Sequence, residues 1–219
     1  PILSRELHTY ELPIAYAVKI PSAIIIDYQL NTTYLIDQDS DQSRIDTILT
    51  DIELIKPIPE ENILGELSQE NEDKFISGVK ACLDYIVAGD VFQVNLSRQW
   101  QYILTKEIDS AVIYHALKNA NPAPFSALVQ YENFSIVSSS PERLLSVQDG
   151  VLQTRPIAGT HPRGEGSEDK AQKEDLINHP KEIAEHVMLL DLERNDMGRV
   201  CEYGSVFVNE VMTLETYPY

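Results

Sequence analysis

The spacing of hydrophobic and polar residues predicts strands first and a helix next in the N-terminal part of the chain. Three short runs rich in β-branched residues are predicted strands, at residues 16–20, 23–27 and 32–36. A turn-like segment at residues 29–31 separates the second run from the third. Hydrophobic residues then recur at helical spacing over residues 44–54, and a proline-containing linker follows at residues 56–62.

A longer amphipathic helix is predicted after the linker. Ser68 is the expected N-cap, acidic residues follow it, and Gly89 ends the helix as a C-cap glycine does. One hydrophobic stripe runs along this helix and consists of Phe75, Ile76, Val79, Cys82, Leu83 and Ile86. Residues 91–98 then alternate hydrophobic and polar positions, which predicts a half-buried strand.

The rest of the chain is predicted to alternate between hairpins and helices. The pattern gives a helix at residues 110–119, hairpins at 125–138 and 143–155, helical segments between about 168 and 192, and a last strand-like stretch at 205–217. This order predicts an α+β fold with a largely antiparallel β-sheet and helices packed outside it.

Acidic residues outnumber basic ones by two to one. The 219 residues include 35 Asp and Glu against 17 Lys and Arg, which gives a formal net charge of −18 at pH 7. Such a surface repels phosphate backbones and anionic membranes, so nucleic acid and membrane lipid are not expected as partners. An anionic substrate would need local positive charge or a metal, which is a reason to look for a cation site. Hydrophobic residues make up 43% of the chain, as in globular proteins.

The two cysteines, Cys82 and Cys201, are far apart and do not have the spacing of a zinc site. Two thiols without a secretory signal fit a reducing cytoplasm, where we expect this protein. No hydrophobic run approaches the roughly 18 residues that a membrane span requires. The first residue is Pro1 rather than methionine, so we expect the chain to begin partway through a longer protein.

Two glutamates near the end of the chain are candidate metal ligands. Glu182 and Glu185 lie at positions i and i+3 of a helix that is predicted to begin near Pro180. That spacing puts both carboxylates on one helix face, where they repel each other unless a cation lies between them. A set of oxygen ligands without thiols suits Mg²⁺. Taken alone, such a pair is more often a solvated acidic face than a metal site.

A further glutamate and a proline-glycine loop are candidates for chemistry on a small anion. Glu142 follows the second strand of a hairpin, and a carboxyl group partly shielded by hydrophobic strands could act as a general acid. In the loop at residues 156–160, Gly159 would let the backbone approach a ligand, and Thr160 could hold a carboxylate. On local grounds, a surface glutamate and an ordinary tight turn explain these residues as well.

These segments together resemble the family of chorismate-utilising enzymes. The resemblance extends from about residue 75 to residue 217 and rests on GDVFQVNL at 89–96, SSSPER at 138–143, TRPIAGT at 154–160 and EHVMLLDLERND at 185–196. Four matched segments in order are far more specific than any of them alone. The implied fold is that of anthranilate synthase component I, incomplete in this chain. Residues 1–67 would be the end of an N-terminal region and the linker that follows it. Residues 68–219 would form the N-terminal part of the chorismate-binding catalytic domain.

The resemblance also implies a role for each candidate residue. Glu142 matches the general acid that protonates the departing C4 hydroxyl of chorismate. Glu185 matches a direct Mg²⁺ ligand, and Glu182 matches a ligand that acts through water. Gly159 and Thr160, with Ala158 beside them, match the substrate-binding loop. Ammonia would come from a glutamine amidotransferase subunit and add to the ring. We expect the chain to stop before the family's remaining ligands, which are a histidine, a second metal-binding glutamate, an arginine and several glycines, and to leave hydrophobic surface open.

Two branches of the family compete, together with one alternative of another class. QVNL at 93–96, APFSA at 123–127, PERL at 141–144 and LETYP at 214–218 look more like aminodeoxychorismate synthase, a transaminase-type enzyme that leads to 4-aminobenzoate and folate. Ala158 points the other way, because many such enzymes have a nucleophilic lysine there whereas anthranilate synthases, which are lyases, have alanine. The chain could also be an inactive chorismate-binding or regulatory module, although such a module need not keep Glu142, Glu182 and Glu185.

Overall fold

The computed structural model describes residues 16–217, and the chain divides into two compact units, Pro1–Pro57 and Ile58–Tyr219. The division lies inside the predicted linker, where residues 56–62 form neither helix nor strand. None of the helices in the described residues is long and apolar enough to cross a membrane.

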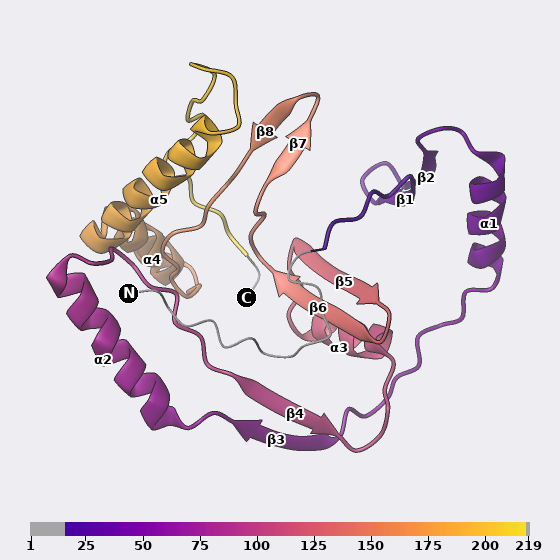
Figure 1. Cartoon of the computed structure of the whole chain (residues 1–219), viewed down its shortest axis with the longest axis horizontal. Helices are drawn as coiled ribbons and strands as arrows, with labels where there is room; N and C mark the ends of the chain where they lie inside the picture. Colours follow the sequence, from indigo (N-terminus) through magenta and orange to yellow (C-terminus); the bar gives the residue numbers. More distant parts are fainter. Residues whose placement is uncertain (1–15, 218–219) are drawn as a thin grey trace. The chain divides into compact units, whose positions relative to one another are not determined.

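The first unit contains a β-hairpin and a helix (Figure 1). β1 (Ser22–Asp27) pairs antiparallel with β2 (Thr32–Asp37), as predicted. The Asp27 carboxylate accepts hydrogen bonds from the backbone N–H groups of Gln29 and Leu30, both at 2.9 Å, and so stabilises the turn between β1 and β2. The strand predicted at residues 16–20 is wrong, because these residues pair with no strand in the described part of the chain.

The helix of the first unit, α1 (Gln42–Glu53), confirms the helical spacing at residues 44–54. Its N-cap is Asp41, whose carboxylate accepts from the backbone N–H groups of Ser43 and Arg44. The Arg44 Nε atom lies 2.7 Å from Oδ2 of Asp37, so an ion pair joins the helix to the end of β2. The Arg44 guanidinium holds the pKa of Asp37 well below its usual range.

The second unit begins with two strands that pair across an inserted helix. β3 (Gly65–Gln69) pairs antiparallel with β4 (Trp100–Leu104), and α2 (Glu72–Ala88) lies between them in the chain. The N-cap of α2 is Asn71, so the prediction of Ser68 is wrong; Ser68 is taken up by the β3–β4 ladder. Gly89 ends the helix at φ +79°, as predicted.

Residues 91–98 are not the predicted strand, because no strand pairs with them in the described residues. Leu96 lies against α2 instead. A Cβ atom added to Gly78 of α2 would lie 3.2 Å from a methyl carbon of Leu96, so the segment runs close along that helix. Arg98 then donates to the backbone carbonyl of Glu70 at 2.9 Å, which fixes the segment before β4 begins. The hydrophobic stripe of α2 is otherwise largely exposed, as expected for open hydrophobic surface.

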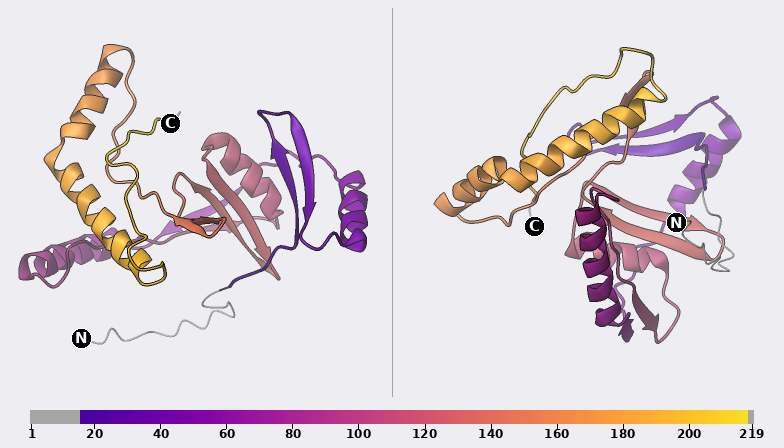
Figure 2. Two further views of the ribbon diagram at one scale, coloured as in Figure 1. Left: turned by 90° about the horizontal axis from the view of Figure 1, so that it is seen from above. Right: turned by 60° about the vertical axis from the view of Figure 1, so that its left-hand side comes forward.

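The packed core of the second unit lies between a helix and a hairpin. α3 (Ser110–Ala120) packs on the antiparallel hairpin of β5 (Phe125–Tyr131) and β6 (Phe134–Ser140), and Figures 1 and 2 show the three side by side. Val112 of α3 is 4% exposed and is the one buried hydrophobic side chain among the described residues. The helix and hairpin agree with the prediction.

A short hairpin and two helices complete the second unit. β7 (Ser146–Gln148) and β8 (Val151–Gln153) pair antiparallel and are shorter than predicted. α4 (Ser167–Asn178) and α5 (Pro180–Gly198) follow, and α5 begins at Pro180 as predicted. The strand predicted at 205–217 is wrong, because no ladder includes these described residues. All ladders in the described chain are antiparallel, in agreement with the α+β fold class.

Candidate active site

Glu142 follows β6 and is joined to the predicted substrate loop. Its Oε1 atom accepts a hydrogen bond from the backbone N–H of Ile157 at 2.9 Å. Ser140 fixes the backbone at the turn, because its hydroxyl donates to the Glu142 carbonyl at 3.0 Å and accepts from the Glu142 N–H at 3.3 Å. The side chain of Glu142 is exposed, so the expected shielding by the hydrophobic strands is not found. The general-acid candidate is therefore positioned by a backbone amide rather than by burial.

The loop at residues 156–160 approaches α5 closely at Gly159. Gly159 has a φ of +74°, a conformation that favours glycine. A Cβ atom added there would lie 2.7 Å from Oε2 of Glu182 and 3.1 Å from its Cβ. The neighbouring Ala158 is half-buried and Thr160 is exposed. The predicted substrate loop thus lies directly against one of the predicted metal ligands.

Glu182 and Glu185 lie on the first turns of α5. The Glu182 side chain is 14% exposed, and its Oε1 atom is 3.7 Å from Nζ of Lys181 and 3.9 Å from Nδ1 of His179. Glu185 is half-buried, and its Oε1 atom accepts a hydrogen bond from Nε2 of Gln93 at 2.9 Å. The sequence pattern does not predict Gln93 as a partner of Glu185, because the alternation around it indicates a strand. The one sequence feature that could have pointed to it is its place in the QVNL segment.

The donor set of these two glutamates suits Mg²⁺. Mg²⁺ binds one or two protein carboxylates and keeps several waters, so the carboxylates of Glu182 and Glu185 are the kind of donors that it prefers. The described residues contain no group of three or more His, Cys, Asp and Glu side chains arranged to hold a metal ion. Waters and substrate oxygens would therefore supply the remaining ligands. Gln93 would orient Glu185 as an outer-shell partner does.

A third glutamate of α5, Glu193, was also missed as a site residue. It lies eleven residues after Glu182, about three helical turns, and therefore on the same helix face. Its Oε2 atom is buried and has no hydrogen-bond partner among the described residues. Burial raises the pKa of Glu193, and the nearby charge of Glu142 acts in the same direction. This face of α5 therefore carries Glu193 as well as Glu182.

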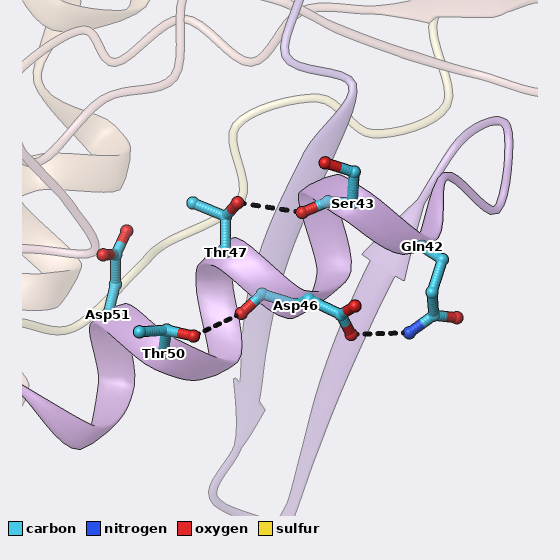
Figure 3. A pocket seen from close by; sticks show the side chains of 6 residues that line it. All are labelled: Gln42, Ser43, Asp46, Thr47, Thr50 and Asp51. Carbon is cyan, nitrogen blue, oxygen red and sulfur yellow. Dashed lines mark hydrogen bonds between the residues drawn. The ribbon is translucent and has the colours of Figure 1, made fainter.

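Two surface hollows lie away from these residues. One, of about 520 Å³, is lined by residues of α1 alone, and Figure 3 shows the hydroxyls of Thr47 and Thr50 bonded to backbone carbonyls one turn earlier. Because one exposed helix forms it, it is a solvated surface. The other, of about 460 Å³, includes Val187 and Asp191 of α5 together with Val208 and Val211. By helical spacing, Val187 and Asp191 lie on the face of α5 opposite Glu182.

Comparison with known proteins finds one family and several relatives. The family described as chorismate binding enzyme matches residues 6–219. Aminodeoxychorismate synthase component 1 of Bacillus subtilis (strain 168) is 39% identical over 97% of this chain and 47% of its own length. Anthranilate synthase component 1 of Synechocystis sp. is 46% identical over 70% of this chain and 31% of its own length.

A solved structure has the same fold. Anthranilate synthase component I from Streptococcus pneumoniae TIGR4 superposes with a TM-score of 0.73 at 31% identity, over 91% of this chain and 46% of that one. The expected fold is therefore confirmed. The chain spans less than half the length of these relatives.

Proposed function

The chain belongs to the family of chorismate binding enzymes, and from that premise we propose that it forms part of an aminodeoxychorismate synthase. The proposed reaction replaces the C4 hydroxyl of chorismate by an amino group, with ammonia consumed and water released, and requires Mg²⁺. A glutamine amidotransferase subunit would supply the ammonia. The observation that carries the proposal is the contact of loop 156–160 with Glu142 on one side and Glu182 on the other.

Each residue has a role that its position supports. Glu142, held by the Ile157 amide, donates a proton to the departing hydroxyl, so that water rather than hydroxide leaves. Gly159 and Thr160 present a backbone N–H and a hydroxyl to the substrate. Glu185 would bind Mg²⁺ directly and Glu182 through water, and the bound ion would clamp a substrate carboxylate against the negative field of the protein.

The branch assignment depends on short segments, QVNL, APFSA, PERL and LETYP, rather than on overall similarity. The Bacillus aminodeoxychorismate synthase is 39% identical over 97% of the chain, and the anthranilate synthase component 1 of Lactococcus lactis is 36% identical over 94% of it. Ala158 offers no amine to the ring, so ammonia itself must form the new C–N bond. Anthranilate synthase, which also releases pyruvate, is the second candidate because alanine at this position suits direct addition.

The decisive experiment is a product assay on the full-length protein with chorismate, Mg²⁺ and ammonia. We expect a product that gives 4-aminobenzoate only after a lyase is added. Fluorescent anthranilate formed without a lyase would refute the branch assignment. Glu142→Gln is the matched variant: it keeps the size of the side chain, loses the proton, and should abolish turnover while chorismate still binds.

A binding titration separates an enzyme from an inactive module. With Mg²⁺ present, the full-length protein should bind chorismate, and chelation of Mg²⁺ should weaken that binding. Failure to bind chorismate at any Mg²⁺ concentration would refute the enzymatic proposal. Binding without any product would favour the regulatory module instead.

A further inference from the structure

We propose that Arg155, Glu215 and Tyr217 are positioning residues that hold Glu142 at a fixed position relative to the proposed substrate loop at residues 156–160. This inference rests on the proposed function, because it concerns the proposed general acid. The three residues come from two segments that are distant in the sequence and together form what we call the clamp.

Arg155 anchors the clamp at the base of the substrate loop. It lies between β8 and Pro156, and its Nε atom is 2.5 Å from Oε1 of Glu215. Its Nη1 atom is 2.9 Å from Oε2 of Glu210. A guanidinium that binds two carboxylates has little rotational freedom, so the segment at residues 210–217 is fixed against the start of the loop.

Tyr217 carries the clamp onward to the residue before Glu142. Its hydroxyl donates to Oε2 of Glu215 at 2.5 Å and lies 3.4 Å from the carbonyl oxygen of Pro141. From Pro141 the chain passes to Glu142, whose carboxylate accepts from Ile157 within the loop. Because the one hydroxyl proton of Tyr217 is donated to Glu215, Tyr217 meets Pro141 by contact alone, and the clamp lies between the base of the loop and the residue before the proposed acid.

The members of the clamp keep their charges near neutral pH. Hydrogen bonding to Glu215 raises the pKa of Arg155 and that of Tyr217, while the Tyr217 hydroxyl, followed by Arg155, lowers the pKa of Glu215. The clamp therefore contains one guanidinium, one carboxylate and one neutral phenol under assay conditions.

The clamp contributes to geometry more than to stability. The side chains of Arg155 and Glu215 are 44% and 39% exposed, and ion pairs with that exposure add little to the free energy of folding. A small displacement of a proton donor, by contrast, is costly for the rate. Removal of the clamp should therefore slow the reaction without unfolding the protein.

The test is Tyr217→Phe in the full-length protein, with Tyr203→Phe as the matched control. Tyr203 is fully exposed, so loss of its hydroxyl should change nothing. For Tyr217→Phe we expect kcat to fall about tenfold while KM for chorismate changes less than about twofold and the melting temperature stays constant. Exchange of the Ile157 amide proton with solvent should become faster only in Tyr217→Phe. Arg155→Lys, which can keep one ion pair, should retain more activity than Arg155→Ala.

The outcomes separate the clamp from the proposed function. If wild-type protein turns over chorismate but Tyr217→Phe keeps kcat within about twofold of it, the clamp is refuted. A loss of kcat matched by a loss of melting temperature would also refute it, since the role would then be structural. If wild-type protein shows no turnover, the proposed function fails, and the Ile157 exchange rate alone decides: unchanged exchange in Tyr217→Phe overturns the clamp, and faster exchange supports it.

Discussion

Replacement of Gly159 by alanine tests the contact between the substrate loop and α5. The substitution has two separate costs. An L-residue at a φ of +74° costs about 1–2 kcal/mol in backbone strain. The new Cβ atom would also lie 2.7 Å from Oε2 of Glu182, 3.0 Å from Cδ1 of Leu176 and 3.1 Å from Cβ of Glu182.

The second cost cannot be relieved by a side-chain rotation alone. The carboxylate of Glu182 and the methyl group of Leu176 can turn away, but the Cβ atom of Glu182 is fixed to the helix and can yield only if the helix or the loop shifts. Overpacking of this kind costs about 1–3 kcal/mol, so Gly159→Ala should lower the free energy of unfolding by about 2–5 kcal/mol in all. Displacement of Glu182 should also raise the Mg²⁺ concentration needed for half-maximal chorismate binding by about tenfold.

Gly150→Ala supplies the matched control. Gly150 has a φ of +79° in the β7–β8 turn, and an added Cβ would meet no atom within 4 Å. Gly150→Ala should therefore lower the free energy of unfolding only by the backbone strain, about 1–2 kcal/mol, and should leave the Mg²⁺ dependence of chorismate binding unchanged. Urea unfolding measures the first effect, and chorismate titration at several Mg²⁺ concentrations measures the second. Equal destabilisation by the two variants, or equal Mg²⁺ dependence, would show that the loop does not press on Glu182.

Three other predictions concern single contacts of the second unit. The Arg163 guanidinium holds the pKa of Asp169 at about 2, below its ordinary 3.8, so this carboxylate stabilises the fold above pH 4 and loses the effect as pH falls toward 2. The difference in urea midpoint between wild type and Asp169→Asn should therefore vanish between pH 4 and pH 2, and a difference that stays constant would contradict the prediction. Gln93→Leu removes the donor to Glu185 and should weaken Mg²⁺-dependent chorismate binding about tenfold, as titration would show. Burial raises the pKa of Glu193, so its ionisation opposes folding as pH rises above the ordinary glutamate pKa of about 4.3. In urea unfolding, Glu193→Gln should gain stability over wild type as pH rises through that range, and no gain would refute this.

Local patterns were sufficient to predict the helices and hairpins. The alternation at 125–138 and the helical spacing at 44–54 each encode an element whose partner is nearby in the sequence. Residues 91–98 and 205–217 have the same strand-like pattern but form no strand, because a strand requires a partner that the local sequence cannot specify. The N-cap at Asn71 was missed since Ser68 is as good a cap in isolation, and pairing of β3 with β4 decides between them.

The candidate site shows the same limit. The resemblance named Glu142, Gly159 and Glu182, and the structure adds that the loop contacts both glutamates. Gln93 and Glu193 could not be found from local spacing. The hydrogen bond of Gln93 joins residues 92 positions apart, and the interest of Glu193 comes from burial, which a charged segment does not reveal.

The hydrogen bond between Gln93 and Glu185 also bears on the order in which this region folds. The bond from Ile157 to Glu142 closes a loop of 15 residues, whereas the bond from Gln93 to Glu185 closes one of 92. Loop-closure entropy makes the longer connection about 1.6 kcal/mol more costly. Glu142 and the loop at residues 156–160 can therefore assemble early as a local unit, whereas the hydrogen bond to Glu185 must wait until the two ends of this longer loop meet. During synthesis, the hydrogen bond between Ile157 and Glu142 can form as soon as residue 157 has left the ribosome. At that point Glu185 has not yet been made, so Gln93 still lacks its partner.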